Sequence, residues 1–133
     1  MSEEIRKGSC LCGGVTYEIT GPMRDVINCH CIQCRKQTGH FMAATRADTA
    51  NFKLTKDETL KWYRASDTAM RAFCDTCSAT LFWQADDNKE KISIAAGTLD
   101  GETGLTTQSD IYVDWKGDYY ELSEDVPHYS ESD

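Results

Sequence analysis

Hydrophobic and polar residues alternate with a period of two over several short parts of the chain. The clearest example is Val15, Tyr17 and Ile19, which alternate with polar residues until the Gly21-Pro22 pair. Successive side chains of a strand point to opposite faces, so this pattern predicts a half-buried strand that ends in a turn. Other alternating or apolar runs predict extended segments over 25–28, 41–46, 52–54, 59–64, 92–97, 111–115 and 119–122.

Two further runs predict a hairpin with cysteines at its tip. Residues 69–73 lead into Cys74-Asp75-Thr76-Cys77, and residues 79–83 lead out of it. Residues 35–39 predict a turn or a single helical turn closed by Gly39. No run sustains a 3.6-residue apolar period over three turns, so we expect a mainly β chain of many short strands.

Length and composition favour one globular domain. The chain has 133 residues, of which 40% are hydrophobic, and this suits a single domain over 1–133. Residues 121–133 are acidic and contain few apolar side chains, which predicts a solvated, mobile tail from about residue 123. No apolar run approaches the roughly 20 residues of a membrane span, and residues 1–7 have no apolar signal core, so we expect a cytoplasmic protein.

The charge of the chain disfavours nucleic acid and anionic membranes as partners. Fourteen Lys and Arg residues stand against 22 Asp and Glu, for a formal net charge of −8. Binding to phosphate backbones depends on many basic contacts. A small anionic substrate would need a local basic patch to overcome the overall field.

All seven cysteines lie in three clusters, which are Cys10/Cys12, Cys29/Cys31/Cys34 and Cys74/Cys77. The number is odd, and in a reducing compartment C-x-C and C-x-x-C spacings favour metal ligation over disulfides. If Cys10 and Cys12 end an extended segment, their Cα atoms lie about 6.6 Å apart on one face, and both sulfurs could reach one ion. The cysteines therefore predict metal sites.

Two pairings of these clusters are possible. Cys31/Cys34 and Cys74/Cys77 could form a four-cysteine site, which leaves three cysteines unused. Alternatively Cys10/Cys12 joins Cys74/Cys77, and the middle trio stays together. Loop-closure entropy favours the second pairing, because three ligands within six residues close almost no loop. In that pairing one site is saturated by four sulfurs and the other keeps an open position.

Four segments together resemble the glutathione-dependent formaldehyde-activating enzyme family: residues 8–15, 29–35, 73–77 and 95–100. The resemblance extends from about residue 8 to residue 129. It implies a β-tent fold of short antiparallel strands stapled by zinc, with two zinc ions per chain. A structural zinc would lie on Cys10, Cys12, Cys74 and Cys77, and a catalytic zinc on Cys29, Cys31 and Cys34.

The sequence departs from the family pattern at two positions. Ser78 stands where the family often has glycine, and Asp110 stands where it often has histidine. The first change affects the geometry of the cysteine knuckle, since serine can hydrogen-bond a loop amide. The second could alter the pocket.

The open site suggests a specific chemistry. Zinc on three thiolates retains a position for a thiol and lowers its pKa, and a thiolate is the nucleophile that adds to a carbonyl. The hypothesis is a carbon-sulfur lyase that joins glutathione to formaldehyde as S-(hydroxymethyl)glutathione, or reverses that addition. Arg35 and Lys36, next to Cys34, and more weakly Lys116 are candidates for binding the carboxylates of glutathione.

Other interpretations remain open at the sequence level. Both zinc ions could be structural, with water or His30 in the open position, and the protein could carry a thiol without catalysis. A thiol-redox role of the trio is also possible, whereas acidity disfavours a chromosome- or cytoskeleton-binding module.

The histidines and tryptophans are ambiguous in the same way. An extended backbone would point His30 away from its neighbouring ligands, which favours a place beside the site or at the surface. His40 is either a proton carrier or an ordinary residue at the start of a strand. Trp83 and Trp115 belong to the packing of the sheets or to the wall of a pocket.

Overall fold

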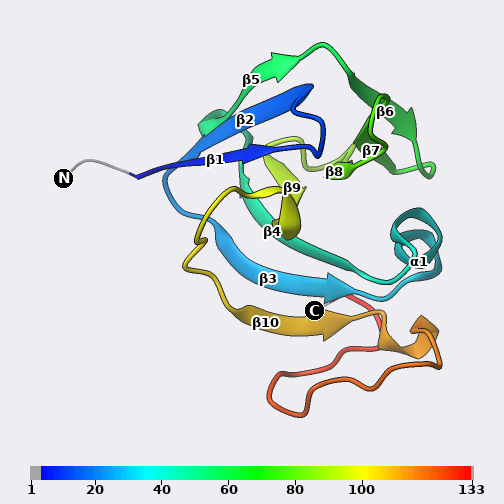
Figure 1. The fold of residues 1–133 in the computed structure, drawn as a ribbon. Helices are drawn as coiled ribbons and strands as arrows, with labels where there is room; N and C mark the ends of the chain where they lie inside the picture. Colours follow the sequence, from blue (N-terminus) through cyan, green and yellow to red (C-terminus); the bar gives the residue numbers. More distant parts are fainter. Residues whose placement is uncertain (1–3, 133) are drawn as a thin grey trace.

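A computed structural model describes residues 4–132 and shows a mainly β protein with one short α-helix among these residues (Figure 1). The strands are β1 (Ile5–Ser9), β2 (Val15–Thr20), β3 (Arg24–Cys29), β4 (Met42–Asp48), β5 (Phe52–Asp57), β6 (Leu60–Arg64), β7 (Ala69–Cys74), β8 (Thr80–Ala85), β9 (Lys91–Ala95) and β10 (Thr107–Ile111). The helix is α1 (Ile32–Thr38), and 3-10 turns cover η1 (Thr49–Asn51), η2 (Ala96–Thr98) and η3 (Val113–Trp115). Within the described part of the chain, no helix is both long and apolar enough to cross a membrane.

The strands form two sheets that pack face to face over one core. The small sheet has the order β1-β2-β5, and the large sheet has the order β10-β3-β4-β9-β8-β7-β6. All pairs are antiparallel except β10 with β3, which run parallel. Figure 1 shows the large sheet curving from β10 and β3 round to β6. The predicted mainly β fold of short strands is confirmed.

The core lies where β2 meets the large sheet. Val15, Tyr17 and Ile19 are buried, as their alternation predicts. The ring of Tyr17 packs edge-on against Phe82 with 5.3 Å between centroids. A Cβ atom on Gly8, opposite Tyr17 in the register, would lie 2.1 Å from the Tyr17 ring, so this close packing requires glycine on β1.

Four local predictions were wrong in detail. The strand expected over 111–115 ends at Ile111, because Tyr112 adopts a left-handed backbone (φ 54°) and a 3-10 turn follows. Residues 119–122 form no strand. The turn expected over 35–39 belongs to the longer helix α1, which Gly39 closes with φ 84° as anticipated. Cys10 and Cys12 lie in a turn after β1 and not at the end of a strand.

The C-terminal segment is solvated but hydrogen-bonded to β10. Most side chains from residue 123 onward are exposed, as the composition indicates. The backbone, however, pairs with β10: the amide of Asp110 donates to the carbonyl of Pro127 (3.0 Å), and the amide of Tyr129 donates to the carbonyl of Asp110 (2.9 Å). Figure 1 shows this segment returning beside β10. Residues 127–131 therefore lie along the edge of the large sheet, where backbone hydrogen bonds hold them beside β10.

Candidate metal centres and the adjoining pocket

The first candidate metal centre brings together four cysteines. Cys10 and Cys12 come from the turn after β1, Cys74 ends β7, and Cys77 lies in the turn before β8. All four sulfur atoms lie within 4.8 Å of one another. The structure therefore has the pairing that loop-closure entropy favours, and Cys74/Cys77 does not join Cys31/Cys34.

The surroundings of these sulfurs fit a closed metal site. The amide of Val15 donates to Sγ of Cys10 (3.2 Å), and the amide of Cys77 donates to Sγ of Cys74 (3.4 Å). Burial raises the pKa of Cys74, but hydrogen bonds from Thr59 and from the amides of Cys77 and Thr76 outweigh it and lower the pKa to about 6. Since the thiolate is the form that binds metal, the cluster suits a four-coordinate ion such as zinc.

The second candidate centre is the cysteine triad, Cys29, Cys31 and Cys34. Cys29 ends β3, Cys31 caps the N-terminus of α1, and Cys34 lies in the first turn of that helix. The change from strand to helix turns the chain back on itself, and the three sulfurs lie within 4.8 Å of one another. Among the described residues the triad has no fourth His, Cys, Asp or Glu ligand.

Hydrogen bonds stabilise a negative charge on the triad. The pKa of Cys31 is lowered to about 2, because Cys29 and Cys34 hydrogen-bond to its sulfur and the Cys34 amide and the charge of Arg71 add to the effect. The Cys34 amide lies 3.3 Å from Sγ of Cys31. The pKa of Cys29 is raised, because its thiol hydrogen-bonds to Cys31 and Cys34. The pKa of Cys34 is also raised, because its hydrogen bond to Cys31 and its burial outweigh the lowering by Cys29. The negative charge therefore lies on Cys31, and a metal cation would be attracted to it.

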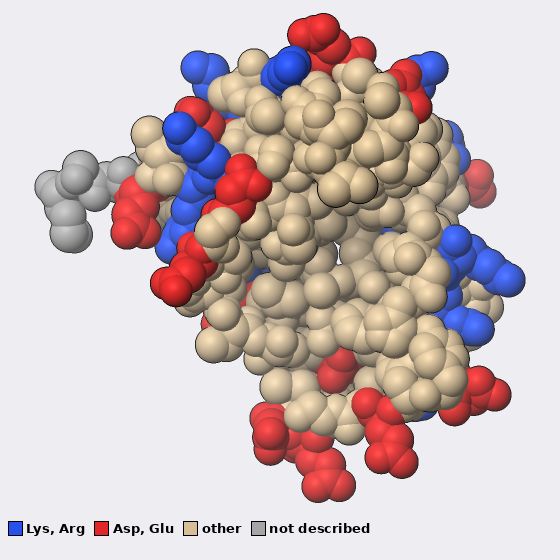
Figure 2. All heavy atoms as spheres, viewed as in Figure 1, with Lys and Arg blue, Asp and Glu red and all other residues tan. Residues whose placement is uncertain are grey.

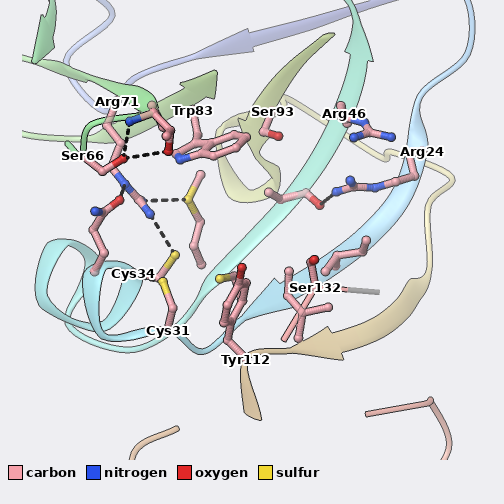
Figure 3. A pocket seen from close by; sticks show the side chains of 18 residues that line it. Arg24, Cys31, Cys34, Arg46, Ser66, Arg71, Trp83, Ser93, Tyr112 and Ser132 are labelled. Atoms are coloured by element: carbon pink, nitrogen blue, oxygen red, sulfur yellow. Dashed lines mark hydrogen bonds between the residues drawn. The ribbon is translucent and has the colours of Figure 1, made fainter. Parts of the chain in front are cut away.

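Arg71 is a site residue that the sequence analysis missed. It is buried, with 3% of its surface exposed, and its Nη2 donates to Sγ of Cys34 over 3.1 Å (Figure 3). Its other nitrogens donate to the side-chain oxygens of Gln33 (2.7 Å) and Gln37 (2.6 Å). Arg71 therefore joins β7 to α1 and orients Cys34.

A pocket of about 460 Å³ opens beside the triad. The triad cysteines line it, together with one row of residues across five strands of the large sheet: in register order Arg24, Arg46, Ser93, Trp83 and Arg71. Figure 3 shows Cys31 and Cys34 at one end and Arg24 and Arg46 at the other. None of the four cysteines of the closed cluster lines this pocket. Of the two candidate centres in the described residues, the triad alone can therefore present a metal to a molecule bound there.

The basic residues proposed from the sequence lie outside this pocket. Arg35 donates to the carbonyl of Trp115 (3.1 Å), and Lys116 donates to the carbonyls of Gly117 and Tyr120. Lys36 is exposed on α1, and none of the three lines the pocket. Figure 2 shows basic side chains gathered on the outer surface at the α1 side, with acidic ones along the lower edge.

Of the two tryptophans, Trp83 lines the pocket and Trp115 does not.

His30 is buried and does not fill the open position of the triad. Its Nε2 lies 2.7 Å from Oδ1 of Asp110, and its Nδ1 lies 2.6 Å from the hydroxyl of Tyr120. Of the two positions expected for His30, the one at the surface is wrong, and the ring lies buried with the carboxylate of Asp110 as its partner. His40 is exposed and hydrogen-bonds the hydroxyl of Tyr119 (2.7 Å).

Comparison with known proteins finds a matching family, a relative and a similar solved structure. The family model described as glutathione-dependent formaldehyde-activating enzyme matches residues 5–115. An uncharacterized lyase of Schizosaccharomyces pombe is 27% identical over 118 residues, which cover 88% of this chain and 85% of that protein. A crystal structure of a Rhodobacter sphaeroides protein superposes with a TM-score of 0.61 at 25% identity, covering 92% of this chain and 98% of the other.

Proposed function

Because the chain belongs to the glutathione-dependent formaldehyde-activating enzyme family, we propose that it is a zinc-dependent carbon-sulfur lyase that joins glutathione to formaldehyde, or releases it. The family and the lyase name of the yeast relative support a lyase-like role. The observation that carries the finer proposal is the triad, with three sulfurs together at the wall of a pocket that the four-cysteine cluster does not reach.

The residues present fit zinc at both centres. Cys29, Cys31 and Cys34 would hold the reactive zinc, and Cys10, Cys12, Cys74 and Cys77 would hold a structural one. When bound to three protein thiolates, zinc lowers the pKa of a thiol that takes its fourth position. The guanidinium of Arg71, at 3.1 Å from Sγ of Cys34, offsets the negative charge of three thiolates on one side.

The reaction forms one carbon-sulfur bond and protonates the carbonyl oxygen. The thiolate sulfur of glutathione attacks the carbonyl carbon, the π electrons of the carbonyl move to its oxygen, and that oxygen takes up a proton. In the reverse direction the oxygen loses the proton and the carbon-sulfur bond breaks. The pocket must therefore position an aldehyde near the triad and supply a proton to its oxygen.

Tyr112 is the side chain best placed to donate that proton. Its ring lines the pocket and extends into it at the triad end (Figure 3). Its left-handed backbone (φ 54°) is unusual for an aromatic residue and is held by a hydrogen bond from its amide to the carbonyl of Glu131 (3.2 Å). The C-terminal segment thus orients Tyr112.

Apolar residues complete the pocket and limit the water around the aldehyde. Ile27, Met42, Ala44, Trp83 and Ile111 contribute to its lining. Formaldehyde is largely hydrated in water, and only the free carbonyl reacts with a thiolate. An apolar lining that excludes part of the water therefore favours the free carbonyl form of formaldehyde.

The experiment is an NMR measurement of exchange between free and hydroxymethylated glutathione. Thiols add to formaldehyde spontaneously, so the readout is the exchange rate with zinc-loaded protein against the rate without protein. We expect acceleration by the native protein, its loss in Cys31→Ser with the fold intact, and a decrease of about 100-fold in Tyr112→Phe with adduct binding retained. No acceleration with both sites loaded would leave only a thiol carrier.

A further inference from the structure

We propose that Arg24 and Arg46 form the binding site for a carboxylate of the thiol substrate, so that the pocket selects a peptide-sized anionic thiol. The inference rests on the proposed function in one respect, which is that the thiol sulfur is bound at the triad. The site is distinct from the basic residues on the outer face of α1.

The two arginines lie directly opposite each other. Arg24 of β3 pairs with Arg46 of β4 in the antiparallel register, and both line the pocket. Like charges in such a cross-strand pair repel each other, so an anion bound to Arg46 would lower this repulsion. A guanidinium group binds a carboxylate well, because its planar fork can donate two parallel hydrogen bonds.

The pocket contains no acidic counterpart among the described residues. Three arginines line it, and no Asp or Glu of residues 4–132 does so, although the chain has 22 acidic residues. Arg71 is engaged by Cys34, Gln33 and Gln37. Arg24 is anchored to the carbonyls of Ala44 (2.8 Å) and Asp25 (3.1 Å).

Arg46 is the residue available to a ligand. It is half-buried, and within residues 4–132 it makes no side-chain hydrogen bond or ion pair. A guanidinium that loses water without gaining a partner costs free energy, and a bound carboxylate would recover it. Ser93, opposite Arg46 on β9, adds a hydroxyl at the same end of the pocket.

The spacing along β4 defines the size of the thiol. Met42 is opposite Cys29, and Arg46 lies four residues further along the same strand. At about 3.4 Å per residue, the backbone positions at the two ends of the pocket are therefore separated by roughly 14 Å. Free cysteine, whose carboxylate adjoins its thiol, is too short to reach both ends, whereas a tripeptide such as glutathione is long enough.

Binding tests the carboxylate site without turnover. S-methylglutathione, which has no reactive thiol, is titrated into ¹⁵N-labelled zinc-loaded protein. We expect Arg46→Gln to weaken its affinity roughly tenfold or more, and Arg46→Lys to weaken it less. Arg6→Gln on β1 of the small sheet removes the same charge outside the pocket and should leave the affinity unchanged.

The diethyl ester of S-methylglutathione gives a second measurement on native protein alone. It lacks both carboxylates and should bind the native protein at least tenfold more weakly than the acid. This comparison decides the question even if an Arg46 variant fails to fold. Equal affinity of acid and ester for native protein, or equal affinity of native and Arg46→Gln protein for the acid, would overturn the inference.

Kinetics then separate this inference from the proposed function. With glutathione, Arg46→Gln should raise KM about tenfold and leave kcat nearly unchanged, while KM for 2-mercaptoethanol should not change. If native protein accelerates no exchange but binds S-methylglutathione through Arg46, the lyase proposal fails and the carboxylate site stands. If exchange is accelerated and KM for glutathione is the same in Arg46→Gln, the lyase proposal stands and the carboxylate site is refuted.

Discussion

Ser78 holds a backbone conformation that normally belongs to glycine. Its φ is 66°, and its amide donates to the carbonyl of Cys74 (2.8 Å), which closes the knuckle of the four-cysteine cluster. A Cβ atom in this region crowds the backbone, at a cost on the order of 1 kcal/mol. A glycine here would avoid that cost, so Ser78 strains the knuckle without removing a ligand.

We therefore expect Ser78→Gly to leave the free energy of unfolding nearly unchanged, because relief of about 1 kcal/mol of backbone strain offsets the unfolded-state entropy that a new glycine costs. The measurement is urea unfolding with both metal sites saturated. Asp87→Gly is the matched control, because Asp87 lies in an exposed turn and is not among the positive-φ residues of the described chain. The control should lower stability by about 0.5–1 kcal/mol through unfolded-state entropy, and equal losses in both variants would contradict the strain argument.

At the scale of elements, the junction of β3 and α1 creates the triad, and β7 supports it through Arg71. The helix is too short to be stable alone. Its buried contact with the sheet depends on the hydrogen bonds from Arg71 to Gln33, Cys34 and Gln37. A charged group that hydrogen-bonds to a metal ligand influences the orientation and the charge of that ligand.

Arg71→Met tests this role with an apolar side chain of similar length. We expect the zinc affinity of the triad to fall about 10- to 100-fold, because Sγ of Cys34 loses its cationic donor. The four-cysteine site should keep its affinity, since Arg71 does not contact it. Zinc release in competition with a chromogenic chelator measures both sites, and Arg64→Met on β6 serves as the control.

The C-terminal segment is a second element whose role can be measured. Its residues make four backbone hydrogen bonds with Asp110, Tyr112 and Val113. Ending the chain at Val126 removes them and should lower the free energy of unfolding by about 2–4 kcal/mol. Exchange catalysis should fall as well, because Tyr112 loses its anchor. A solvated tail would instead give no change, as we expect for the exposed control Glu124→Ala.

At the scale of the whole molecule, the two candidate metal centres differ in what they hold together. The four-cysteine cluster joins the turn after β1, in the small sheet, to the β7–β8 hairpin of the large sheet. The triad joins only residues within six positions of the chain. Metal at the first centre therefore closes the interface between the sheets, and metal at the second orders a local turn.

Chelation should accordingly act in two steps. Loss of zinc from the triad should abolish exchange catalysis while the circular dichroism stays native. Loss from the four-cysteine site should unfold the domain, since structural zinc contributes on the order of 10 kcal/mol of apparent stability. Zinc release and near-ultraviolet dichroism recorded together would test the order. Simultaneous loss of both ions, with unfolding, would show that the triad is also structural.

Much of this protein is determined by short-range sequence pattern. The period-two runs predict β2 and the core positions Val15, Tyr17 and Ile19, because alternation is a local consequence of strand geometry. The spacing of the cysteines predicts two metal clusters, because ligands close in sequence need little entropy to converge. Gly39 predicts the end of α1 for a similarly local reason.

Tertiary structure alone decided which basic residues face the pocket. Arg35 and Lys36 adjoin Cys34 in sequence, yet α1 directs them outward, whereas Arg24, Arg46 and Arg71 converge from three strands. Strand register sets these positions, and register depends on contacts between residues far apart in the chain. The pairing of the C-terminal segment with β10 and the burial of His30 against Asp110 are long-range for the same reason. Composition describes how polar a segment is, but only the packed sheet determines what lies beside it.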